Sequence, residues 1–163
     1  MAEQDQAQGL SKQLVLQKIY IKDFSFESPR APDVFATSVT PQTQLNIRSG
    51  AKEVSGGAHE VTLTLTVEAK DQEKTLFLIE LEQAGVFLIQ GYTPDEHQML
   101  VGSYCPGTLY PFAREAISDM VSRGGFPQLL LQPINFDALY AQAVRERQQS
   151  NGEQAAEVPA QGH

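Results

Sequence analysis

Alternating apolar and polar residues dominate the first half of the chain. The clearest stretch runs from Glu60 to Ala69, where Val61, Leu63, Leu65 and Val67 alternate with glutamate and threonine. Side chains in a β-strand point to opposite faces with period two, so this pattern predicts a strand with one apolar and one polar face.

Three further strands are predicted around it. Residues 14–27 are rich in β-branched and aromatic side chains and end at Ser28-Pro29, where proline removes a backbone donor. Leu45 and Ile47 indicate a short strand, and the Gly- and Ser-rich residues 48–59 are expected to form a flexible connection. A polar hairpin turn then leads into a long strand over residues 75–91. Together these segments predict a four-stranded antiparallel sheet.

Residues 29–41 combine prolines with apolar side chains and are expected to form an ordered crossover loop. After the sheet, Thr93 is a candidate N-cap for a short helix over residues 94–104. The main helix is indicated by apolar residues with spacing i, i+3, i+4 and i+7, namely Leu109, Phe112, Ala113, Ala116, Ile117, Met120 and Val121. Arg123-Gly124-Gly125 should end it, and a final helix is expected to end near Gln149.

The predicted fold class is therefore α+β, with the sheet packed on one long and two shorter helices. A chain of 163 residues is sufficient for a single domain with its own core. We expect a flexible N-terminal segment (1–13), one folded domain (14–149) and a disordered C-terminal tail (150–163).

The amino-acid composition excludes several classes of function. Twenty acidic against twelve basic residues give a formal net charge of −8, which disfavours nucleic acids and anionic membranes as partners. No apolar run approaches the roughly 20 residues needed to cross a bilayer, so membrane insertion is not expected. The polar, acidic start lacks the features of a secretory signal, and the single Cys105 excludes an internal disulfide framework. These observations predict a cytoplasmic protein.

Catalytic machinery is not indicated. Gly56-Gly57 lacks the Gly-Lys-Ser/Thr ending of a phosphate-binding loop. His59 and His97 are distant in sequence, with no second His or Cys at ligand spacing, so no metal site is predicted. Cys105 is expected to be a small buried hydrophobe. The sequence therefore predicts a non-enzymatic protein without a cofactor.

Three blocks of sequence carry a resemblance to a known family. They are IYIKDFSFESPRAPDVF (19–35), LFLIELEQAGVFLIQG (76–91) and the run from Tyr104 to Tyr140. In this order they resemble the SecB family of bacterial protein-export chaperones. The resemblance implies an ATP-independent holdase that keeps secretory precursors unfolded and delivers them to SecA. It also implies a homotetramer built as a dimer of dimers, which would complete the burial of the apolar sheet face.

The same resemblance assigns a SecA-binding role to Asp23, Glu27, Leu78 and Glu80. Strand alternation places all four on the face away from the core. Carboxylates beside an exposed apolar residue suit a partner that carries Lys or Arg and an apolar anchor. Taken from the residues alone, an ordinary solvated surface is the alternative explanation.

Apolar residues are the candidates for a groove that binds unfolded clients: Phe35, Val39, Leu45, Ile47, Leu109 and Phe112. The sequence alone does not separate groove from core among them. The family commonly has a tryptophan in the crossover loop, two residues before its proline, whereas this chain has Val39 there and no tryptophan. That difference affects one aromatic subsite and leaves the client-binding hypothesis unchanged.

Three alternatives accompany this hypothesis. A SecB-like chaperone dedicated to another client, such as an antitoxin, would bind one sequence rather than unfolded chains in general. A small-ligand enzyme would need a convergent polar pocket. A structural scaffold would form oligomers that bind neither unfolded chains nor SecA.

Overall fold

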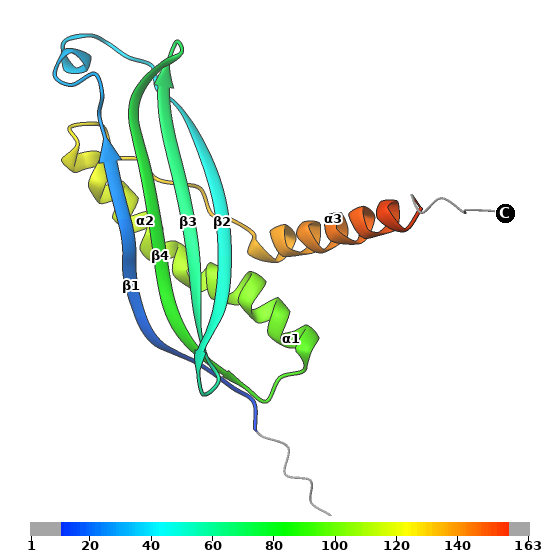
Figure 1. Ribbon diagram of the computed structural model, residues 1–163. Helices are drawn as coiled ribbons and strands as arrows, with labels where there is room; N and C mark the ends of the chain where they lie inside the picture. The colour runs from blue at the N-terminus through cyan, green and yellow to red at the C-terminus, as the bar shows by residue number, and fades with distance from the viewer. Residues whose placement is uncertain (1–10, 157–163) are drawn as a thin grey trace, which may run out of the picture.

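The computed structural model describes residues 11–156, and its centre is a twisted sheet of four antiparallel strands (Figure 1). The strands are β1 (Gln13–Glu27), β2 (Gln42–Ser55), β3 (Ala58–Asp71) and β4 (Lys74–Gln90). Their order in the sheet is β1-β4-β3-β2, so the two strands that come first in sequence lie at opposite edges. The predicted α+β class and four-stranded antiparallel sheet are confirmed.

The crossover from β1 to β2 follows from this strand order. The chain passes from one edge to the other around one end of the sheet, and it contains a short 3-10 helix, η1 (Asp33–Ala36) (Figure 1). Val34 of this helix is buried and belongs to the hydrophobic core. The crossover is therefore an anchored part of the fold, as its apolar residues predicted.

Strand β2 is much longer than predicted. Residues expected to form a flexible connection are paired with β3, from Arg48 opposite Thr64 to Glu53 opposite His59. The chain reverses at Gly56 and Gly57, which have φ values of 57° and 84°, in the left-handed region that glycine adopts most easily. Pairing with β3 supplies the backbone hydrogen bonds that this Gly- and Ser-containing segment lacks by itself.

Three α-helices and one π-helical turn follow the sheet. They are α1 (Pro94–Met99), the turn η2 (Leu100–Tyr104), α2 (Cys105–Arg123) and α3 (Phe136–Ala156). The predicted N-cap is confirmed, because Glu96 N donates to Thr93 Oγ1 at 3.3 Å and Thr93 N donates to Glu96 Oε2 at 3.0 Å. This reciprocal pair is a capping box.

The last helix corrects two predictions. Helix α3 ends at Ala156 rather than near Gln149. With 21 residues it is slightly longer than α2, which has 19. The fold thus has two long helices and one short one, and residues 150–156, expected to be disordered, are helical. The rest of the expected tail (157–163) and most of the expected flexible N-terminal segment (1–10) lie outside the described residues.

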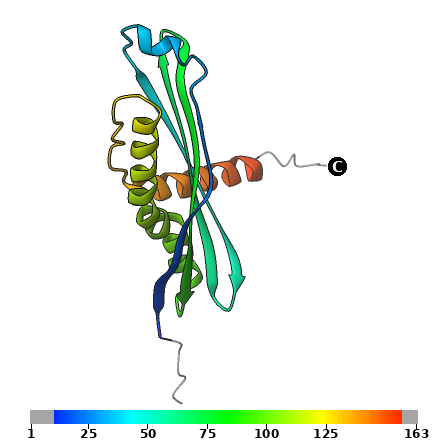
Figure 2. The same cartoon turned by 90° about the vertical axis from the view of Figure 1, so that its left-hand side faces the viewer.

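The core lies between one face of the sheet and α2. We call this the inner face and the opposite one the outer face (Figure 2). Helix α2 contacts β3 and β4, and α3 projects beyond the β2 edge (Figure 1). Fully buried side chains at the contact include Val61, Leu63, Leu65, Val67, Ile79, Leu81, Leu109, Ile117 and Val121. None of the helices within the described residues is long and apolar enough to span a bilayer.

Candidate functional site

An acidic surface forms where β1 and β4 lie side by side on the outer face. The register places Glu27 opposite Leu78, Ser25 opposite Glu80 and Asp23 opposite Glu82. Directly opposed side chains in an antiparallel pair are roughly 5 Å apart at Cβ. The four residues assigned by resemblance, Asp23, Glu27, Leu78 and Glu80, therefore occupy one continuous patch.

Two further acids belong to this patch and were not among the predicted residues. Glu82 follows Glu80 at the strand period, and Glu68 of β3 lies opposite Leu78. Strand alternation along residues 76–91 already contained the signal for Glu82. We call Asp23, Glu27, Glu68, Leu78, Glu80 and Glu82 the acidic patch. Asp23, Glu80 and Glu82 also border a hollow of about 280 Å³ that extends across the sheet to Arg48 of β2.

Elsewhere on the outer face, a buried carboxylate is neutralised within the chain. Glu60 of β3 accepts hydrogen bonds from Lys22 Nζ at 2.8 Å and from the Tyr20 hydroxyl, and Lys52 Nζ lies 3.7 Å away. The bonds from Lys22 and then Tyr20 lower the pKa of Glu60. Burial, helped by Glu60, raises the pKa of Tyr20 to about 12.

The acidic patch differs from this network in its charge balance, although one member, Glu68, pairs with Lys70 Nζ at 3.6 Å. Within the part of the chain that the structure describes, no Lys or Arg forms an ion pair with Asp23, Glu27 or Glu80. All three side chains are exposed, and Leu78 is half-buried among them. Their negative charge is therefore available to a cationic partner, with Leu78 as an apolar contact.

The predicted groove residues separate into different environments. Phe35 of η1 is 52% exposed and rests on an aromatic cluster at the crossover end of the sheet. Its ring centroid lies 5.4 Å from that of Phe126, which in turn lies 5.0 Å from Phe77. Phe126 was not among the predicted residues, although it begins the strongly apolar loop after α2.

The prediction that Leu109 lines the groove is corrected by the structure. Leu109 is fully buried, whereas Phe112, three residues further along α2, is 46% exposed. Leu109 shares its helix face with Ala113 and Ile117, which point into the core, and the helical twist turns Phe112 outward. Leu109 is thus a core residue, and Phe112 stays a candidate for client contact.

Val39, Leu45 and Ile47 are half-buried and pack against the hydrophobic core. Leu45 and Ile47 lie on the inner face of the edge strand β2, opposite Val67 and Leu65. Ile47 also lines a hollow of about 440 Å³ between β2, η2 and α3, together with Val101, Phe136, Leu139 and Tyr140. This hollow adds α3 residues that were not among the predicted groove residues.

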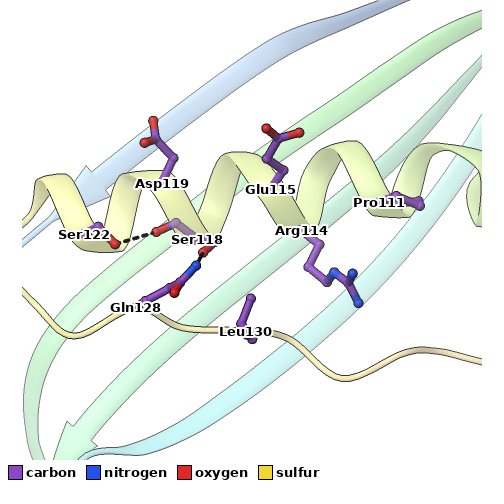
Figure 3. A pocket seen from close by; sticks show the side chains of 8 residues that line it. All are labelled: Pro111, Arg114, Glu115, Ser118, Asp119, Ser122, Gln128 and Leu130. Atoms are coloured by element: carbon purple, nitrogen blue, oxygen red, sulfur yellow. Dashed lines mark hydrogen bonds between the residues drawn. The ribbon is translucent and has the colours of Figure 1, made fainter.

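A third hollow, of about 490 Å³, lies between the outward side of α2 and the loop that follows it (Figure 3). Gln128 Nε2 donates to Ser118 Oγ at 3.1 Å, and Ser122 Oγ donates to the Ser118 carbonyl at 3.2 Å. The bond from Gln128 ties the loop to the helix, whereas the bond from Ser122 lies within α2. Leu130 is 63% exposed at the rim of the hollow. Leu130 adds an apolar contact to an otherwise polar surface of Arg114, Glu115 and Asp119.

Cys105 occupies the position expected of a structural cysteine. It is fully buried at the start of α2, and burial raises the pKa of its thiol to about 12. A thiol with so little thiolate at neutral pH is a poor nucleophile.

Comparison with known proteins identifies close relatives. The family model described as SecB, preprotein translocase subunit SecB, matches residues 5–147. The protein-export protein SecB of Nitrosococcus oceani is 46% identical over 158 residues, covering 96% of this chain and 94% of the relative. The protein-export protein SecB of Methylococcus capsulatus is 47% identical over 149 residues, covering 91% and 95%.

A solved structure shares the fold. It is a Mycobacterium tuberculosis SecB-like chaperone in complex with a ChAD peptide from an antitoxin. The TM-score is 0.59 at 20% identity, with 74% of this chain and 90% of the other covered. At that identity the likeness concerns the fold alone.

Proposed function

Because this chain belongs to the SecB family, whose members are chaperones of protein export and not enzymes, we propose that it holds unfolded secretory precursors and delivers them to SecA. Retention requires no nucleotide, since the clients are held by contacts that form and break at equilibrium. The proposed place of action is the cytoplasm, before the precursor reaches the export machinery.

The acidic patch is the observation that carries the SecA part of the proposal. Asp23, Glu27 and Glu80 are exposed without an ion pair among the described residues, and Leu78 lies between them in the register. A partner with Lys or Arg around an apolar side chain would match this surface, and the charges would speed association and set the orientation. Glu82 would extend the contact.

Client binding is assigned to exposed apolar side chains around the helix layer. Phe35, Phe112 and Leu130 are exposed, and Val39, Leu45 and Ile47 are partly accessible. An unfolded chain offers hydrophobic side chains but no fixed shape, so several separate apolar contacts suit it better than one deep pocket. Weak sites become strong retention when one client engages several of them.

Self-association into a homotetramer, a dimer of dimers, would multiply these sites. The edge strand β1 exposes Val15, Leu16 and Ile21, each at least 39% accessible. An apolar edge strand is a surface that proteins normally cover. A second copy of the chain is the partner we propose for this edge.

Native mass spectrometry of the purified protein tests the proposal. The protein is measured alone, with a chemically unfolded secretory precursor, and with the same precursor already folded. A tetramer that retains only the unfolded form is the expected result. Retention of one specific folded or short partner, such as an antitoxin, would instead favour a dedicated chaperone, and a monomer that retains neither form would contradict the proposal.

A further inference from the structure

A histidine pair connects the end of the sheet to the first helix. His59 of β3 and His97 of α1 are separated by 38 positions, yet their Nε2 atoms lie 3.2 Å apart. The ring centroids are 4.5 Å apart in an edge-on arrangement. The long separation in sequence had argued against a metal site, but the β2–β3 hairpin and the turn into α1 bring the two rings together.

The tautomer of His59 follows from its second contact. His59 Nδ1 lies 3.1 Å from the Gly57 carbonyl oxygen, which can only accept a hydrogen bond. Nδ1 must therefore carry the proton, and Nε2 of the neutral ring presents its lone pair toward His97. Metal-binding histidines are commonly held in this way, with the second ring nitrogen donating to a backbone carbonyl.

The distance between the two nitrogens also fits a shared ion. With metal–nitrogen distances of about 2.0–2.1 Å, two imidazoles at angles from 90° to tetrahedral have nitrogens about 2.9–3.4 Å apart. The 3.2 Å separation lies within this range. A neutral pair joined by one hydrogen bond has a similar distance, so both states can form without moving the backbone.

A carboxylate stands beside the pair. Glu53 of β2 lies directly opposite His59 in the register, and its side chain is exposed. Among the described residues, no third His, Cys or carboxylate already stands in ligand position. The remaining coordination positions are therefore open to water and to the Glu53 carboxylate after a change of rotamer.

We propose that His59 and His97 form a binding site for a divalent transition metal of the Zn²⁺, Ni²⁺ and Cu²⁺ group. Imidazole nitrogen suits these ions and not Mg²⁺ or Ca²⁺. The ion would fasten α1 to the β2–β3 hairpin. Occupancy would stabilise the folded chain at the point where the sheet passes into the helix layer, independently of client or SecA binding.

Calorimetric titration of the untagged full-length protein with Zn²⁺ tests the site. We expect one ion per chain, and about tenfold or greater loss of affinity in His59→Gln and in His97→Gln. The matched control is His163→Gln, since His163 is the third histidine of the chain and should not contribute. Glu53→Gln should weaken binding less than either histidine variant. Unchanged affinity in His97→Gln, or loss of binding in His163→Gln, would overturn the proposal.

A second measurement remains decisive if a histidine variant fails to fold. Histidine ring resonances of the wild-type protein are recorded by NMR during a Zn²⁺ titration. The ring signals of two of the three histidines should shift as Zn²⁺ is added. In a parallel thermal-unfolding experiment, the midpoint temperature should rise over the same range of Zn²⁺ concentration. Zn²⁺ that shifts no ring signal, or only that of His163, would refute the site.

Discussion

Leu109 of α2 packs directly on Gly85 of β4, so closely that a Cβ on Gly85 would lie 3.0 Å from Leu109 Cδ2. The absence of a side chain at Gly85 lets the helix approach the sheet at this point. The contact explains why Leu109 is enclosed in the core while Phe112, on the next face of the helix, is exposed.

Leu109→Ala should lower the free energy of unfolding by about 2–5 kcal/mol, because a fully buried leucine leaves a cavity when truncated. Urea denaturation measures the change. Phe112→Ala is the matched comparison on the same helix: it should change stability by less than about 1 kcal/mol. If Phe112 contacts clients, its variant should instead release an unfolded precursor faster. Equal losses of stability in both variants would contradict the separation of core from surface.

Charge reversal in the acidic patch should weaken the proposed contact with SecA. Asp23→Lys combined with Glu80→Lys places two cations where a basic partner is expected, and affinity should fall about tenfold or more. Calorimetry with purified SecA measures this.

Glu115→Lys with Asp119→Lys, on the outward side of α2, is the control with the same change in net charge (Figure 3). It should leave SecA affinity unchanged. Client retention should survive both double variants. If reversal in the acidic patch abolished client retention as well, two separate surfaces would no longer be tenable.

Gly124→Ala should destabilise the end of α2. A Cβ at Gly124 would lie 2.2 Å from Phe26 Cζ, so the aromatic ring or the helix end must move, at a cost of about 1–3 kcal/mol. Thermal unfolding measures it. Gly152→Ala in α3 meets no atom within 4 Å and should raise helix stability by up to about 1 kcal/mol. Adding Phe26→Leu to Gly124→Ala should recover part of the loss, and no recovery would mean that strain arises elsewhere.

Cys105 should resist alkylation in the native state. With its pKa raised to about 12, only about one thiol in ten thousand is ionised at pH 8, and burial also blocks access. Labelling with a thiol reagent should therefore follow unfolding, and Leu109→Ala should accelerate it. Rapid labelling of the folded wild-type protein would contradict the buried position.

Local sequence patterns were sufficient to predict features that depend on a single strand or a single helix turn. The alternation from Glu60 to Ala69 specified β3 and its inner face, and Thr93 before Pro94 specified the start of α1. The same alternation placed Asp23 and Glu80 on one face of the sheet, which the register between β1 and β4 then brought together.

Long-range pairing explains what the sequence did not reveal. Residues 48–55 look like a linker because Ser49 and Gly50 interrupt the apolar alternation, and only β3 stabilises them as a strand. The contact between His59 and His97 likewise depends on a hairpin and a helix start that meet in space. Helical periodicity placed Leu109 and Phe112 in one apolar stripe. The sequence did not show that Phe112 is exposed, because the width of the stripe that is covered depends on which elements pack against the helix.

The strand order has a consequence for folding while the chain is synthesised on the ribosome. β1 ends at Glu27, and its hydrogen-bonding partner β4 begins only at Lys74. At synthesis rates of roughly 5–20 residues per second, β1 waits unpaired for several seconds while β2, β3 and β4 are made and can join as consecutive hairpins. During its synthesis this chaperone of protein export therefore exposes an apolar strand of its own. Only β4, the last strand to be made, pairs with that strand.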